Sequence, residues 1–157
     1  MNKIWKFIIS IAVCQLAGAI GSFFTAPEID NWYASLTRPS IAPPNWVFAP
    51  VWTTLFFLMG LAVYLVWLKG SDKKEVKLAL ITFDLQLLFN IFWSILFFGL
   101  QSPSWAFAEI LVLLLLIALT IISFAKVSKA AAWLLAPYLV WVSLAVILNF
   151  QFWQLNY

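Results

Sequence analysis

Few residues in this chain can carry chemistry, and their types restrict what that chemistry can be. The sequence has no histidine and one cysteine, Cys14, which stands inside an apolar run without a second thiol. A zinc centre, a histidine-ligated haem and a Ser-His-Asp relay therefore lack their usual ligand or base. A disulfide is excluded as well. The side-chain groups that remain as candidates are indole rings, amides and two carboxylates within apolar sequence, Asp84 and Glu109.

Three of the ten tryptophans stand out by their depth. Seven lie near the ends of apolar segments, which is where tryptophan gathers at a membrane interface. Trp52, Trp93 and Trp141 are each at least about 8 to 15 Å inside a segment, by helix rise. Helical spacing gives each of them neighbours on one face. The three predicted stripes are Phe48, Trp52, Phe56 and Met59; Gln86, Asn90, Trp93 and Phe97; and Trp141, Ala145, Asn149 and Phe152.

The stripes predict one cavity enclosed by three aromatic walls. Asn90 and Asn149 should face the interior, because an amide in lipid needs a partner. A pocket of flat rings with a few polar groups suits a large planar apolar ligand. The alternative is that each asparagine only joins neighbouring helices by hydrogen bonds.

The two carboxylates cannot form a paired acid and base. Asp84 lies roughly 9 Å from the inner end of its segment and Glu109 roughly 6 Å from the outer end of another. An ionisable residue inside a membrane segment is a functional candidate by default. The alternatives are that Asp84 is paired with Lys77 or hydrated near the interface, and that Glu109 reaches the outer headgroups or closes the cavity.

Composition places the chain in the membrane. Charged residues make up 10% and hydrophobic residues 65%, against roughly a quarter charged in soluble domains. Apolar runs of about 20 residues predict five transmembrane helices, at about 5–25, 45–68, 78–100, 105–125 and 131–154. The chain is then a single all-α domain, 1–157, with a long outer loop at 26–44. Ala17-Gly18-Ala19 resembles a signal-peptide cleavage site, but the apolar run continues past it.

The positive charges predict the orientation of this multi-pass protein in the cell membrane. With the N-terminus cytoplasmic and the C-terminus outside, all eight lysines fall on the inner side and Arg38 alone falls outside. Because the charges lie in short connections, they orient the protein and do not indicate nucleic acid as a partner. No metal ligand set and no cofactor is expected.

The stretch from Trp32 to Trp52 holds four of the seven prolines. Pro43-Pro44-Asn45 predicts a turn followed by a helix cap, and Pro50 and Pro137 predict kinks that leave carbonyl groups free. In the first segment the small residues Ala17, Gly18, Gly21 and Ser22 form a surface that suits a closely packed helix, either an internal neighbour or a dimer partner.

Three motifs resemble the translocator protein (TspO) family, once called peripheral benzodiazepine receptors. The first is Trp-Tyr-x-x-Leu-x-Arg-Pro at 32–39, followed by Pro43-Pro44 and Phe48-x-Pro50-Val51-Trp52. The second runs from Asn90 to Gly99, and the third is Pro137-Tyr138-x-x-Trp141-x-x-x-Ala145-x-x-Leu148-Asn149. They cover residues about 30 to 150 in the family's order and spacing.

The resemblance implies a five-helix bundle, usually a homodimer, that binds porphyrins and benzodiazepine-type drugs beneath the first long loop. Carried over by position, the ligand-binding residues would be Tyr33, Pro43, Pro44, Trp46, Trp52, Phe56, Asn90, Trp93, Trp141, Ala145 and Asn149. Arg38 is added as a partner for a propionate or as a loop-structuring residue. The cholesterol pattern of animal members is missing, because Phe150 and Gln154 stand where it needs a tyrosine and a basic residue.

Three functions follow as hypotheses. The first is a membrane protein that binds a tetrapyrrole of the protoporphyrin type through the ring faces of its indoles. The second, from the light-dependent porphyrin breakdown associated with bacterial relatives, is an enzyme in which Trp52 and Trp141 are the catalytic residues. The third is a transporter, or a sensory or regulatory scaffold, for porphyrins or other apolar ligands.

Overall fold

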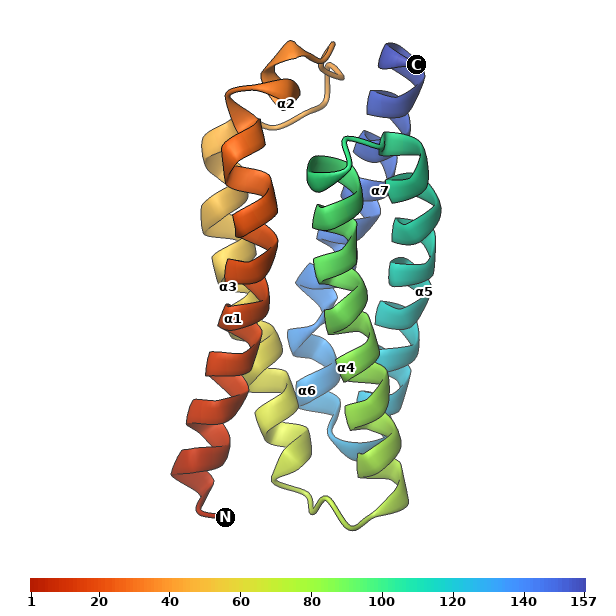
Figure 1. Cartoon of the computed structure of the whole chain (residues 1–157). Coiled ribbons are helices and arrows are strands. Elements are labelled where there is room, and N and C mark those ends of the chain that lie inside the picture. The colour runs from red at the N-terminus through yellow and green to blue at the C-terminus, as the bar shows by residue number, and fades with distance from the viewer.

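The computed structural model describes residues 1–157 and is a bundle of five long helices (Figure 1). The helices are α1 (Lys3–Ile29), α2 (Trp32–Ser35), α3 (Asn45–Trp67), α4 (Lys74–Ser94), α5 (Pro103–Val127), α6 (Lys129–Leu134) and α7 (Ala136–Asn156). Five segments, with α6 and α7 counted as one, are long and apolar enough to cross a membrane. The predicted all-α, five-helix membrane fold is confirmed.

The outer loop begins later than the sequence suggested. Helix α1 continues to Ile29 and includes Pro27. Pro27 has no N–H, so the last turn of α1 lacks the hydrogen bond that this residue would donate to the Phe23 carbonyl. Asn31 then donates from Nδ2 to the Pro27 carbonyl over 2.7 Å, which satisfies one of the last carbonyl groups. The loop therefore starts after Ile29, not at residue 26, and carries the short helix α2 within it.

Prolines also divide the fifth membrane segment. Helix α6 ends at Leu134, Leu135 intervenes, and α7 starts at Ala136 with Pro137 in its first turn. The predicted kink at Pro137 is thus a break between two helices. Pro50 lies inside α3, which continues through it.

Helix α4 closes with a π-helical turn, Ile95–Gly99, that the sequence pattern did not predict. A π turn is wider than an α turn and changes the direction of the side chains that follow it. The adjacent rings of Phe97 and Phe98 are both buried as a result. Turns of this kind are frequent at functional sites.

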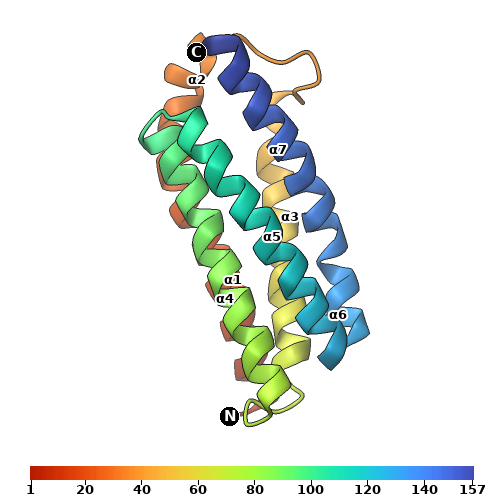
Figure 2. The same cartoon turned by 90° about the vertical axis from the view of Figure 1, so that its right-hand side faces the viewer.

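The bundle has two distinct ends. The N-terminus, the α3–α4 connection and the α5–α6 connection lie at one end, called here the lysine end, because the eight lysines lie in these segments or in the helix turns next to them. Helix α2, the loop after it, which contains Arg38, and the C-terminus lie at the other, called the loop end (Figure 1). Figure 2 shows α6 near the lysine end and α7 rising from it beside α5 to the loop end.

The small residues of α1 are used within the chain. A side chain at Gly18 would come within 2.7 Å of the Phe56 ring, and one at Gly21 within 3.2 Å of the Ser94 hydroxyl. Gly60 of α3 likewise approaches the backbone of Ile11. Close approach of this kind needs glycine. Of the two alternatives for the small-residue surface, the structure shows the internal neighbours, α3 and α4.

Candidate functional site

A cavity of about 540 Å³ lies inside the loop-end half of the bundle, between α1, α3, α4 and α7. The three predicted stripes converge on it. Their members in the lining are Phe48, Trp52, Phe56, Asn90, Trp93, Phe97, Trp141, Ala145, Asn149 and Phe152. Met59 and Gln86, the two remaining members, are buried outside the lining. The stripes follow from helical periodicity, but only the packing of the helices decides where the cavity stops.

The aromatic walls are built from rings that contact one another at defined angles. Trp93 stacks on Phe97, with ring centroids 5.0 Å apart and an interplanar angle of 22°. Trp141 meets Phe48 edge to face across α7 and α3, at 5.9 Å and 71°. Such pairs stabilise by about 0.5–1.5 kcal/mol beyond the area they bury. The rings are therefore held in place before any ligand arrives.

Asn149 ties three helices together at the cavity wall. Its Oδ1 accepts from Trp93 Nε1 over 2.9 Å, and its Nδ2 donates to the Pro103 carbonyl over 2.8 Å. Its side chain is buried. Asn149 therefore joins helices and lines the cavity at the same time, so the two alternatives raised by the sequence do not exclude each other.

A second buried polar chain starts at Asn90. Its Nδ2 donates to the Tyr138 hydroxyl over 2.8 Å, and this hydroxyl donates to Gln86 Oε1 over 2.8 Å. Tyr138 is 1% exposed. The sequence did not predict this central role for Tyr138, although a tyrosine buried in a membrane helix needs a partner. With Nδ2 engaged, Asn90 has its Oδ1 left for other contacts at the cavity wall.

Tyr33 connects the loop to the cavity. Its buried ring lines the cavity and contacts Phe98 and Phe152, with centroid distances of 5.6 and 5.2 Å. The Arg38 guanidinium lies 5.6 Å from the Tyr33 ring centre. Burial raises the pKa of the Tyr33 hydroxyl above its ordinary value, and the charge of Arg38 opposes part of that rise.

Arg38 is bonded within the loop. Its Nη1 donates to Asn45 Oδ1 over 2.5 Å, and its Nη2 donates to the Pro43 carbonyl over 2.6 Å. Two donors fixed in this fork hold the loop against the start of α3. Arg38, Pro43 and Pro44 lie outside the cavity lining. Of the two roles considered for Arg38, the geometry favours the structuring of the loop.

Trp46 does not line the cavity. It is 75% exposed, although the resemblance placed it in the pocket. The reason is its position in the helix, because α3 begins at Asn45 and Trp46 stands two residues before Phe48. Two residues correspond to about 200° of rotation, so the two rings point to nearly opposite faces.

One wall of the cavity was missed. Gly18, Gly21, Ser22 and Thr25 of α1 line it, although the sequence pattern was interpreted only as a packing surface. Small residues give a helix a flat face, which can receive either another helix or a ligand. The signal was therefore present in the sequence, but it did not distinguish these two uses.

The membrane carboxylates lie outside the cavity. Both oxygens of Glu109 are buried without a hydrogen-bond partner, so this carboxyl group neither reaches the headgroups nor closes the cavity. Asp84 is exposed on the outside of α4. No three metal-ligating side chains come together anywhere in the chain. The polar side-chain atoms of the lining residues belong to amides, hydroxyls and indole N–H groups.

The fold and the cavity define a class: a multi-pass membrane protein whose helical bundle encloses an aromatic cavity beneath a proline-rich loop. The model of the TspO/MBR family matches residues 10–154, and the chain belongs to this family.

Relatives of known name are similar over nearly their whole length. The tryptophan-rich protein TspO of Chlorobaculum tepidum is 45% identical over 99% of both chains. The translocator protein of Homo sapiens is 41% identical over 88% of this chain and 82% of its own. The tryptophan-rich sensory protein of Cereibacter sphaeroides is 36% identical over 100% of this chain and 96% of its own.

Proposed function

We propose that this protein binds a tetrapyrrole of the protoporphyrin type in its cavity, and that benzodiazepine-type drugs occupy the same space. The observation that carries the proposal is the cavity itself, about 540 Å³ lined by three deep indoles and by no charged side chain. Its size lies within the roughly 300–1,000 Å³ typical of small-molecule sites. The ligand would come from the surrounding lipid, and no resident cofactor is part of the proposal.

The lining residues have distinct roles in this proposal. Trp52, Trp93 and Trp141 contact the faces of the macrocycle, because contacts between aromatic rings are favourable beyond the area that they bury. Asn90 accepts a hydrogen bond through Oδ1. Carboxylate groups of the ligand point toward the loop end, where Arg38 is bonded within the loop outside the cavity lining and supplies the one positive side-chain charge.

Quenching of tryptophan emission by protoporphyrin tests the site. The double variant Trp52→Phe Trp141→Phe should weaken binding by about tenfold or more, which corresponds to about 1.4 kcal/mol. The matched control is Trp5→Phe Trp133→Phe, because these two indoles are exposed at 59% and 76% and lie near the lysine end. Equal affinity in both double variants would refute the cavity as the binding site.

A second proposal is that the protein breaks down porphyrin in light. It is supported by the two indoles, Trp52 and Trp141, that face the cavity from α3 and α7. The excited porphyrin can take one electron from an indole and pass it to O2, which becomes superoxide. The indole radical cation then regains its electron by oxidising the macrocycle, so the net step moves one electron from the porphyrin to O2. The Trp141→Phe variant should then keep binding and lose the light- and oxygen-dependent product. If the wild type shows only the bleaching of free porphyrin, it is not an enzyme.

Transport or sensing is the alternative to binding alone. The name of the Cereibacter sphaeroides relative, tryptophan-rich sensory protein, supports a regulatory scaffold. Porphyrin flux into proteoliposomes would separate the two, since a sensor binds its ligand without moving it across the membrane.

We further propose that the lysine end faces the cytoplasm and that the chain forms a homodimer. The lysine distribution supports the orientation. The exposed apolar face of α1, around Val13 and Leu16, can pack against a second copy. Labelling of single cysteines at the two ends in intact cells tests the first point, and mass measurement of the protein in native nanodiscs tests the second.

A further inference from the structure

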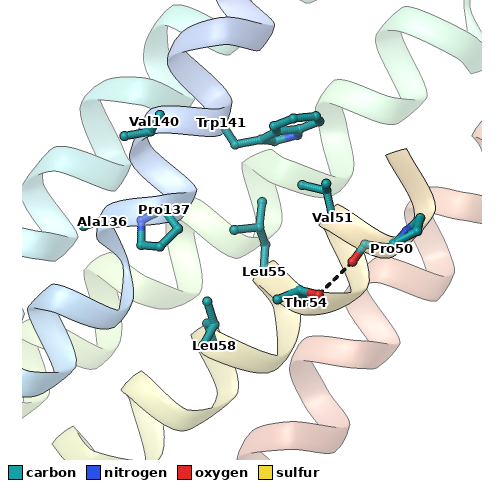
Figure 3. Close-up of a pocket in the computed structure, with 9 residues that line it drawn as sticks. All are labelled: Pro50, Val51, Thr54, Leu55, Leu58, Ala136, Pro137, Val140 and Trp141. Carbon is teal, nitrogen blue, oxygen red and sulfur yellow. Dashed lines mark hydrogen bonds between the residues drawn. The ribbon is translucent and has the colours of Figure 1, made fainter. Parts of the chain in front are cut away.

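A second hollow lies between α3 and α7, on the outside of the bundle. This groove has a volume of about 630 Å³ and is lined by side chains from these two helices alone. Figure 3 shows Val51, Leu55 and Leu58 on α3 facing Pro137 and Trp141 on α7. Val140 is 70% exposed at its rim. The groove therefore opens toward the acyl chains that surround a membrane bundle.

The groove exists because α3 and α7 separate. Helix α3 packs against α1, α4 and α6, but α7 packs chiefly against α5. The two helices part where a proline stands in each, Pro50 in α3 and Pro137 in α7, and both prolines line the groove. Prolines bend helices or end them, so they can move two helices apart.

The surface of the groove is apolar. Thr54 is its one polar side chain, and its hydroxyl donates to the Pro50 carbonyl over 2.8 Å (Figure 3). The hydroxyl group thus has its hydrogen-bond partner within its own helix and needs none from a ligand. No charged side chain lines the groove. An apolar molecule dissolved in the bilayer can occupy it without losing a polar contact.

Trp141 belongs to both hollows. It is the one residue that lines the groove and the cavity. On the cavity side its ring meets the edge of Phe48. Next to this pair, Trp52 of α3 contacts Tyr138 of α7 at 6.3 Å. At this level α3 and α7 are joined by contacts between aromatic side chains.

We propose that the groove is a lateral portal, through which a planar apolar ligand passes from the bilayer into the cavity when the Trp141 and Phe48 side chains rotate. This inference rests on the proposed binding function and adds the route by which the ligand enters the cavity. Side-chain rotation in the bundle needs no change of backbone, whereas movement of the loop does.

The loop end offers a more restricted route. Asn156 at the end of α7 accepts from the Thr37 N–H over 2.7 Å and donates to the Thr37 carbonyl over 3.1 Å. Glu28 of α1 accepts from Gln101 over 3.2 Å. The Asn156 bonds and the Arg38 bond to Asn45 fasten the loop to α7 and α3, and the Glu28–Gln101 bond ties the end of α1 to the connection between α4 and α5. A large ligand could pass there only after several of them had opened.

Filling the groove tests the portal. In Thr54→Phe Val140→Phe, both changed residues line the groove but not the cavity. The full chain in lipid vesicles is mixed with vesicles that carry protoporphyrin, and the quenching of tryptophan emission is followed in time. We expect the association and dissociation rates to fall together by about tenfold, within the one to three decades typical of variants of one site. The dissociation constant should stay unchanged, because a route does not alter the end states.

Two matched controls complete the kinetic test. Val112→Phe Leu115→Phe adds the same rings to lipid-facing positions of α5 and should leave both rates unchanged. Asn156→Ala releases the loop and should also leave them unchanged. If the groove variant binds at the wild-type rates, the portal is refuted, and faster binding by Asn156→Ala would assign access to the loop end.

A chemical block avoids any effect of the substitutions on folding. Val140→Cys is labelled after assembly with a bulky maleimide, and the rates are compared before and after. Cys14 is fully buried and does not compete for the label. Val112→Cys serves as the labelled control. Unchanged rates after labelling at Val140 would refute the portal, whereas absence of porphyrin binding in every sample would refute the binding function itself.

Discussion

The two halves of the bundle are made from the same helices but are built in different ways. Near the lysine end, Met59, Ala62, Ala79 and Phe124 are fully buried in one continuous core. Toward the loop end the same helices surround a cavity, and the lining rings of Phe48, Trp52, Trp93 and Trp141 are only partly buried. The packed half is stabilised by close contact between side chains. The hollow half has less of this contact, so its stability depends more on hydrogen bonds and ring pairs.

The physical origin of the difference is the position of glycine and proline. Gly18 and Gly60 allow α1 and α3 to approach closely. Pro50 and the break at Leu135 allow α3 and α7 to diverge. A composition that is equally hydrophobic throughout therefore gives a solid half and a hollow half.

The largest effect is expected from a pair of substitutions, one in each half. Gly60→Leu should destabilise the protein by about 1–3 kcal/mol or more, because overpacking forces neighbouring groups to move. A side chain at this position would lie only 3.0 Å from the Ile11 Cα atom, which is backbone and cannot easily move. Ala145→Leu adds a similar volume to the cavity wall and should leave stability nearly unchanged while weakening protoporphyrin binding. Thermal unfolding in detergent and emission quenching measure the two effects.

The contrast between the halves fails if the two leucine variants unfold at the same temperature. In that case the cavity would tolerate added volume no better than the core does.

The next effect concerns the hydrogen bonds that replace packing near the cavity. Tyr138→Phe keeps the ring but leaves Asn90 Nδ2 and Gln86 Oε1 without their partner. The expected loss is about 1–3 kcal/mol of stability, the cost of unsatisfied buried groups. The control is Tyr64→Phe, since the Tyr64 ring packs edge to face on Phe7 near the lysine end and its hydroxyl has no such role. Comparable unfolding temperatures for the two variants would show that the buried chain does not support the hollow half.

A smaller and local effect is expected at the loop. Asn156→Ala removes two hydrogen bonds to Thr37. Hydrogen exchange of residues 36–44 should become faster by about tenfold, or about 1.4 kcal/mol of local stability. Exchange in α4 and α5 should not change. Slow exchange in the loop of the variant would mean that the Arg38 bonds alone hold it closed.

Much of the fold and part of the site follow from the sequence. Length and hydropathy predict the five helices, and helical periodicity places Trp52, Trp93 and Trp141 on one cavity. The sequence does not show which side chains of different helices contact one another. In the sequence, Tyr138 is only a tyrosine in an apolar segment. The structure shows that its hydroxyl bonds with Asn90 and Gln86.

Trp46 and Glu109 are two further residues whose surroundings cannot be predicted from the sequence. A motif gives Trp46 a place in the pocket, but the start of α3 turns its ring outward. The depth of Glu109 follows from helix rise, whereas the burial of both its oxygens without a partner depends on neighbours that no local pattern encodes.

The smallest effect is an electrostatic one at Tyr33. Because burial raises the pKa of its hydroxyl, the neutral form is favoured in the folded protein. Its contribution to stability is complete below the ordinary tyrosine pKa of about 10 and is lost as the pH rises through the higher folded value. The difference in tyrosinate absorbance between wild type and Tyr33→Phe, followed with pH, reports this titration. Arg38→Gln should move it still higher, since the positive charge of Arg38 lowers the pKa of Tyr33. A Tyr33 titration at or below the ordinary value would show that the ring is not buried between the loop and the cavity.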